Sequence, residues 1–299
     1  MGNLTYWLWV LLAVVGGIIA NTGVIMEKRV VNRISQKDRE KHFYSTLIKS
    51  PLWVIGFILA IIAPAVFIIG SNMFIGPALV PGLVNSGLIV LAIGSVRINK
   101  ERLGSLDYIG IVLMVIAIAS LGLSQLSIAM VGFNYSAPWF LMNTIVFTAV
   151  LFAFWAILLV AQRVGFWNRA ILLSFASGFM LLTSNFWVAP LSGTIIDVLS
   201  GVATTSEWIF FVLSCVLTTL GAIMSTANQQ SAFKYGQAST LTTLQQVPTQ
   251  LAPAFIYLLV FGLSPPQWYS LPLLFAGTVL MFVSFYLLAA RKVEVSEKK

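Results

Sequence analysis

The chain has 299 residues, of which 59% are hydrophobic and only 9% are charged. A soluble domain carries about 25% charged residues, so this composition excludes an ordinary globular protein and indicates an integral membrane protein. The formal net charge of +8 does not require a nucleic-acid partner, because the basic residues occupy short gaps between apolar segments, where they set membrane topology and contact anionic lipid.

Nine apolar segments follow one another along the chain, each about as long as a helix that crosses roughly 30 Å of hydrocarbon. We therefore predict a single all-helical membrane domain over residues 1–299, with nine spans. The predicted spans are 7–26, 51–70, 78–96, 108–124, 138–160, 170–189, 208–227, 240–261 and 269–290.

The positive charges alternate between the gaps. All 17 Lys and Arg residues follow spans one, three, five, seven or nine, and none lies in the other gaps or before span one. Short loops rich in Lys and Arg stay in the cytoplasm. The pattern predicts an N-terminus outside, a C-terminus in the cytoplasm and a multi-pass location, with the cell membrane as the expected membrane.

Polar side chains inside predicted spans are the candidates for function, because they are costly in lipid unless they pair or line a cavity. In the first half, Asn21 in span one suits gating or packing equally well. Asn72 lies at the outer end of span two, where a gate and a simple loop cap are alternatives. Asn85 and Ser86 follow two prolines in span three and are predicted to bind substrate.

In the second half, Asn185 of span six is a further candidate for gating or packing. Span eight is the most polar, and two prolines, Pro248 and Pro253, free backbone carbonyls in it. A kinked polar helix favours solute binding, although hydrogen bonding between helices is the alternative. Its predicted substrate-binding residues are Thr242, Gln245, Gln246, Thr249 and Gln250.

No Asp, Glu, Lys, Arg or His lies within a predicted span, and the nearest, such as Glu27, mark span ends. We expect neutral dipoles to form the binding site, with no buried carboxylate for proton coupling. The sequence names no metal ligands, and no cofactor is expected. No catalytic motif stands out either, so an enzyme is not expected.

A weak internal repeat relates the two halves. Gly76-Pro77-Ala78 and Gly236-Gln237-Ala238 open spans three and eight, and alignment on them places Asn85 on Gln245. The paired spans run in opposite directions, which predicts an inverted repeat of 4 + 5 helices: spans one to four (7–124), an unpaired span five (138–160), and spans six to nine (170–290). Inverted repeats are typical of carriers that work by alternating access.

Short motifs also resemble the drug/metabolite transporter superfamily, and within it the NIPA-like and EamA-like branches. They are Trp53-Val54-Ile55-Gly56, the stretch 74–83 (FIGPALVPGL), Glu101-Arg102, and 228–236 (NQQSAFKYG). The resemblance implies a central cavity whose walls include spans three and eight, and a cytoplasmic gate or structural contact at Glu101. NIPA-like magnesium transporters carry an acidic residue in the second span, where this chain has Val66.

The sequence thus predicts a secondary membrane transporter of the drug/metabolite type that moves a small organic solute. Three alternatives stay open: a NIPA-like transporter of magnesium or another divalent cation, a lipid flippase, and a non-transporting membrane subunit. The expected partners are a small-molecule solute or ion and membrane lipid, with no nucleic acid. Self-association through span four or nine is left open.

Overall fold

The computed structural model describes residues 3–34, 43–87, 89–90, 93–94, 105–165, 168–236 and 238–297. These residues form helices joined by turns, with no strand among them. The first-half helices are α1 (Asn3–Arg33), α3 (Phe43–Ile48), α4 (Pro51–Phe57), α5 (Ala63–Phe74), α6 (Val80–Val84) and α8 (Ser105–Ser124). The second-half helices are α9 (Pro138–Arg163), α10 (Arg169–Leu199), α11 (Thr205–Ala232), α12 (Ala238–Phe255) and α13 (Ser270–Glu297).

Five stretches of these helices are long and apolar enough to cross a membrane: Leu4–Val31, Pro51–Phe74, Pro138–Arg163, Arg169–Leu199 and Thr205–Ala232. Tyr108–Ser124 and Ser270–Ser284 are shorter apolar stretches. The predicted all-helical class and the membrane character are therefore confirmed, whereas the total of nine spans, the inverted repeat and the orientation stay predictions.

Prolines decide where the helices depart from regular geometry. A π-helical turn, η1 (Ile58–Ile62), joins α4 to α5 immediately before Ala63-Pro64, and a second, η2 (Ile256–Val260), follows Pro253 at the end of α12. A proline lacks the N–H that the α-helical ladder needs and crowds the preceding turn, so the hydrogen-bond register shifts near it. Both π-turns lie inside predicted spans.

The predicted span 78–96 differs most from a regular helix. Residues 75–79 form turns, α6 has only five residues, and Asn85 and Ser86 lie in the turn after it. Pro77, Pro81 and Gly82 account for the break, because the prolines remove backbone donors and the glycine weakens the helix. The chain therefore carries a broken segment where a continuous span was predicted.

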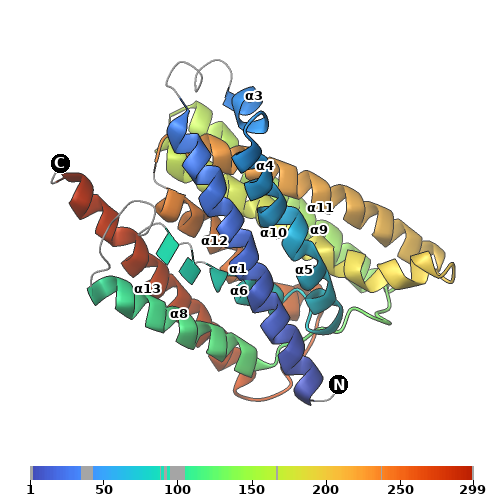
Figure 1. Ribbon diagram of the computed structural model, residues 1–299. Coiled ribbons are helices and arrows are strands. Elements are labelled where there is room, and N and C mark those ends of the chain that lie inside the picture. The colour runs from blue at the N-terminus through green and yellow to red at the C-terminus, as the bar shows by residue number, and fades with distance from the viewer. Residues whose placement is uncertain are drawn as a thin grey trace.

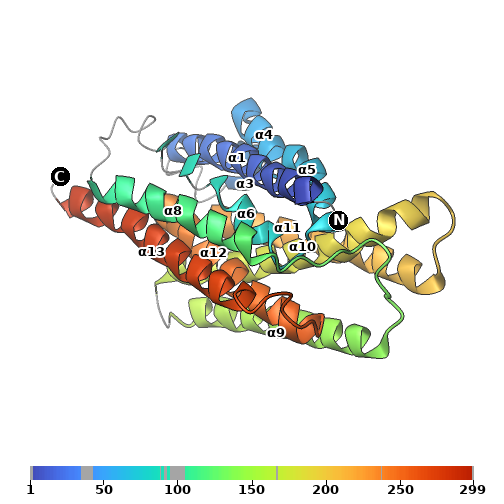
Figure 2. The same ribbon diagram turned by 90° about the horizontal axis from the view of Figure 1, so that it is seen from below.

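The broken segment lies at the centre of the molecule. Helices α6 and α12 contact each other, between the side-by-side pair α8 and α13 and the group formed by α1, α10 and α11 (Figures 1 and 2). Helix α6 also packs on α1, α5 and α8, and α12 packs on α10, α11 and α13. Helix α9 lies outside this arrangement, against α10 and η2.

Different inter-span segments, or gaps, contact each other at the two ends of the bundle. At one end, Tyr44 in the gap after span one bonds to Ser231 in the gap after span seven, with 2.8 Å between their hydroxyl oxygens. At the other end, the backbone N–H of Ile128 donates to the carbonyl oxygen of Ile75 at 3.1 Å, joining the gaps after spans four and two. The two gaps joined at the first end carry positive charge, and the two joined at the other end carry none. The first end is therefore named the basic end.

Candidate functional site

The contact between α6 and α12 brings together residues from the two predicted binding segments. The side-chain amides of Asn85, at the end of α6, and Gln250, in α12, are each 2% exposed. A Cβ added at Gly82 would lie 3.7 Å from Oε1 of Gln250, so α12 passes close to the α6 backbone one turn before Asn85. Two candidates far apart in the sequence therefore belong to one central region.

These two amides have donors without acceptors. Nδ2 of Asn85 and Nε2 of Gln250 are buried and lack a hydrogen-bond partner. Leaving a buried N–H unpaired costs about 1–3 kcal/mol, so proteins rarely retain such groups without a use for them. An acceptor oxygen of a bound molecule would satisfy a donor of this kind.

Other predicted residues of the first half donate hydrogen bonds to backbone carbonyls. Oγ of Ser86 donates to the carbonyl oxygen of Val14 at 3.2 Å, which joins the broken segment to α1. The amide of Asn21 donates to the carbonyl oxygen of Gly17 within α1 at 3.0 Å. A side chain on Gly17 would overlap the backbone carbonyl of Val84, so the two segments touch through their backbones.

Gln245, the residue that the repeat pairs with Asn85, has a different environment. Its Nε2 donates to Oγ of Ser177 on α10 at 2.9 Å and to Oγ of Ser225 on α11 at 3.1 Å. Ser177 in turn donates to the carbonyl oxygen of Ser225 at 2.7 Å. These contacts match the alternative of hydrogen bonding between helices that the sequence left open for span eight.

The remaining span-eight residues are also engaged. Thr249 donates from Oγ1 to the backbone carbonyl and the side-chain oxygen of Gln246, at 2.7 and 2.9 Å. Oγ1 of Thr242 accepts from Nε2 of Gln229 on α11 at 3.3 Å. Of the predicted residues of this helix, Gln250 is thus the one whose side chain keeps an unpaired buried donor among the described contacts.

The predicted gates lie in separate places. Asn72 is buried in α5 and donates to the carbonyl oxygen of Ile68 at 2.9 Å. Asn185 is half-buried and lies mid-helix, because α10 continues to Leu199, past the predicted end of span six. Glu101 lies outside the described residues.

A buried carboxylate corrects the expectation of a carboxylate-free interior. Helix α1 continues past the predicted end of span one to Arg33, so Glu27 belongs to the helix and is only 4% exposed. Nε2 of Gln230, in the last turns of α11, donates to its Oε2 at 2.5 Å. The sequence holds a signal for this position: Glu27 lies four residues from both Gly23 and Val31, on the face that packs inward.

Aromatic and basic residues close the basic end around this carboxylate. Nζ of Lys28 donates to the carbonyl oxygen of Gly236 at 3.2 Å, and Nζ of Lys234 lies 4.1 Å from the centroid of the Phe43 ring. Burial, and secondarily the charge of Arg169, lowers the pKa of Lys234. The first-half segments α1 and α3 are thus tied to the α11–α12 turn.

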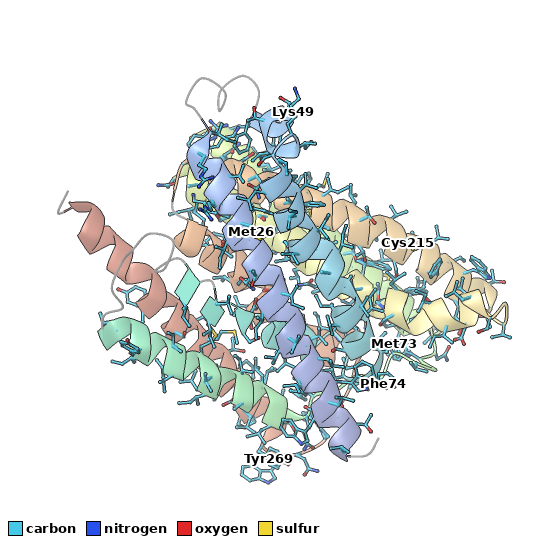
Figure 3. All side chains as sticks on the ribbon, in the orientation of Figure 1. Met26, Lys49, Met73, Phe74, Cys215 and Tyr269 are labelled. Atoms are coloured by element: carbon cyan, nitrogen blue, oxygen red, sulfur yellow. The ribbon has the colours of Figure 1, made fainter. Side chains whose placement is uncertain are left out.

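The opposite end is closed by an aromatic cluster built around Tyr135 and Phe140 (labelled side chains of this end, such as Phe74 and Tyr269, appear in Figure 3). The hydroxyl of Tyr135 donates to the carbonyl oxygen of Met130 at 3.1 Å. Burial raises the pKa of Tyr135, and the carboxylates of Glu207 and Asp197 raise it further, so the phenol keeps its proton and the hydrogen bond.

The described residues contain no group of three or more His, Cys, Asp or Glu side chains arranged to hold a metal ion. The polar groups of Asn85 and Gln250 at the centre are neutral amides, which act by hydrogen bonding. Comparison with known proteins returned no matching family model, no matching curated protein and no matching solved structure, so the functional conclusion rests on the geometry of the site.

Proposed function

We propose that this protein is a secondary membrane transporter of the drug/metabolite type, which moves a small organic solute across the membrane by alternating access. The observation that carries the proposal is the pair of unpaired amide donors, Asn85 Nδ2 and Gln250 Nε2, buried where two proline-containing segments meet. Broken helices at the middle of a bundle are the usual place for solute binding in such carriers.

The packing of the two halves supports a repeat. In the first half α1 packs on α4, α5 and α6, and in the second half α10 packs on α11 and α12. Gly17 of α1 meets the backbone of Val84, as Gly178 of α10 meets the backbone of Gln245. Equivalent helices thus approach equivalent partners, as the pairing of spans one to four with spans six to nine requires.

The chemistry of the two donors favours a solute that offers acceptor oxygens, such as a carbonyl, hydroxyl or carboxylate group. A divalent cation needs oxygen ligands rather than N–H donors. Unpaired amide donors therefore favour the organic solute over the magnesium alternative. A lipid flippase and a non-transporting subunit are distinguished by experiment.

The test is a thermal-shift screen of the purified protein in detergent, with organic acids, amino acids, nucleosides, amines, lipids and magnesium chloride as probes. A ligand that binds the folded state raises the melting temperature by mass action. We expect a concentration-dependent shift from an oxygen-rich organic solute that is lost in Gln250→Leu. Gln267→Leu, which changes an exposed glutamine in a loop, is the matched control and should keep the shift.

A shift from magnesium alone would replace the proposal with the cation transporter, and a shift from lipid alone would replace it with the flippase. No shift from any probe, or the same shift in both variants, would contradict a solute site at Gln250.

A further inference from the structure

Glu27 and Gln230 form a contact between the two halves at the basic end, and the amide of Gln230 is only half used. Its Nε2 donates to Oε2 of Glu27 at 2.5 Å, while its Oε1 is buried and has no partner. Both side chains are nearly inaccessible, at 4% and 2% exposed. The unpaired Oε1 is therefore an acceptor on the same amide whose Nε2 already donates to Glu27.

The protonation state of Glu27 decides whether this acceptor can be satisfied. An ionised carboxylate only accepts hydrogen bonds, whereas a protonated carboxyl offers one donor and one acceptor. A protonated Glu27 can accept from Nε2 and donate to Oε1 of the same amide, which pairs both polar edges. Burying an unpaired charge is much more costly than burying a neutral, paired group.

We propose that Glu27 is a proton-binding site that couples proton release to the opening of the basic end. The inference rests on the proposed transport function, since coupling has a meaning only if the protein moves a solute. In the closed arrangement Glu27 is shielded from water and bonded to Gln230, and its carboxyl group binds the proton. Opening admits water to the carboxyl group, and the proton leaves to that water.

The elements around Glu27 differ in their titratable groups. Neither α4 nor α12 has a titratable side chain, and a side chain on Gly56 of α4 would press on the Glu27 backbone, so that side of the site stays apolar. At the basic end, the described titratable groups of the other neighbouring elements are basic or phenolic: Lys28, Arg29 and Arg33 on α1, Tyr44 on α3, Arg169 on α10, and Lys234 and Tyr235 after α11. Tyr6 of α1, Asp197 of α10, and Glu207 and Cys215 of α11 lie further along their helices.

Three of these cations have described contacts with other groups. Lys28 bonds to Gly236, Lys234 lies over the Phe43 ring, and the Arg169 guanidinium lies 5.0 Å from the centroid of the Tyr235 ring. Once water enters, the carboxylate is hydrated and the cost of burying its charge is relieved, which favours the ionised form. The closed state therefore binds the proton more tightly than the open state, and by linkage a rise in pH favours opening.

The first measurement uses the proton itself as the probe, in proteoliposomes without solute. Infrared spectra recorded between about pH 5 and pH 9 follow the C=O stretch of protonated carboxyl groups. We expect a band that persists near neutral pH in the wild type and in Glu207→Gln, but is missing in Glu27→Gln. Glu207 is the matched control because it is a partly exposed carboxylate of a capping box at the other end. A wild-type spectrum with only ionised carboxylates over this range would overturn the proposal.

The second measurement follows opening in a Cys215→Ser background with a reporter Ala232→Cys, a fully buried position at the basic end. The rate of maleimide labelling, divided by that of an exposed reference Ser200→Cys, should rise with pH by up to about tenfold per pH unit, the limit for one proton. Glu27→Gln imitates the neutral state and should label slowly at every pH. The same pH dependence in Glu27→Gln would contradict the coupling.

Failure of this proposal is separable from failure of the proposed function. The proton titration needs neither Asn85 nor Gln250, so Gln250→Leu should keep the infrared band and the pH-dependent labelling. Loss of solute binding in Gln250→Leu, in contrast, tests the transport site alone.

Discussion

At the scale of single residues, the buried amides of this protein belong to two groups. Gln245 and Asn21 donate to oxygens of the protein, whereas Asn85 and Gln250 keep unpaired donors. Removing a bonded amide loses stability, but replacing an unpaired buried amide by an apolar side chain of similar size removes a penalty. Stability measurements without ligand therefore separate structural amides from functional ones.

Asn85→Leu should leave the stability of the ligand-free protein unchanged or raise it, because Leu needs no acceptor for a buried donor. The measurement is the midpoint of reversible unfolding in mixed detergent micelles, compared with the wild type. A loss above about 1 kcal/mol would mean that the Asn85 amide supports the fold and is not held ready for a ligand.

Gln245→Leu should behave in the opposite way. It removes the hydrogen bonds from Nε2 to Ser177 and Ser225, which join α12 to α10 and α11. We expect a destabilisation of about 1–2 kcal/mol in the same unfolding assay. An unchanged midpoint would argue that Gln245 faces a ligand site in spite of these contacts.

At the scale of elements, close backbone approaches position the broken segments. Gly17 permits α1 to touch the end of α6, and Gly178 permits α10 to touch α12, because neither has a Cβ. Small residues have this role in membrane helices, where packing rather than the hydrophobic effect holds helices together. The central position of α6 and α12 thus depends on two glycines that lie in other helices, α1 and α10, and that are not themselves predicted binding residues.

Gly17→Ala and Gly178→Ala should each destabilise the protein, by about 1–3 kcal/mol or more, since each new methyl group meets backbone of a neighbouring helix. Gly122→Ala is the control. Its added Cβ would lie 3.3 Å from the Trp7 ring, a side chain with room to shift, so the loss should be smaller. If thermal unfolding shows equal destabilisation by all three substitutions, the backbone contacts at Gly17 and Gly178 do not matter more for stability than the contact at Gly122.

At the scale of the whole molecule, the polarity of the protein is inverted relative to a soluble one. Apolar side chains such as Ile145, Ile157 and Ile223 are more than half exposed, while the amides and hydroxyls discussed above are buried. A surface of this kind is stable only where lipid covers it. Among the gaps that carry positive charge, those after spans one, five and seven meet at one end of the bundle.

Cysteine labelling in intact cells tests the orientation. In a Cys215→Ser background, Ser200→Cys should react with a membrane-impermeant maleimide from outside, because it lies at the end without predicted basic loops. Lys49→Cys, at the basic end, should react only after the membrane is permeabilised. The reverse pattern would overturn the predicted orientation while leaving the fold unchanged.

The sequence by itself determined the class of this protein and the approximate location of most of its helical segments, because hydrophobic length and composition are local properties of the chain. It also identified Asn85 and Gln250 as candidates. Only the tertiary structure decided that Gln245 is bonded to α10 and α11 while Gln250 keeps a free donor, and that Glu27 is buried against Gln230. The burial and pairing of a polar group depend on which helix lies opposite, and the periodicity of a single helix cannot specify its neighbour.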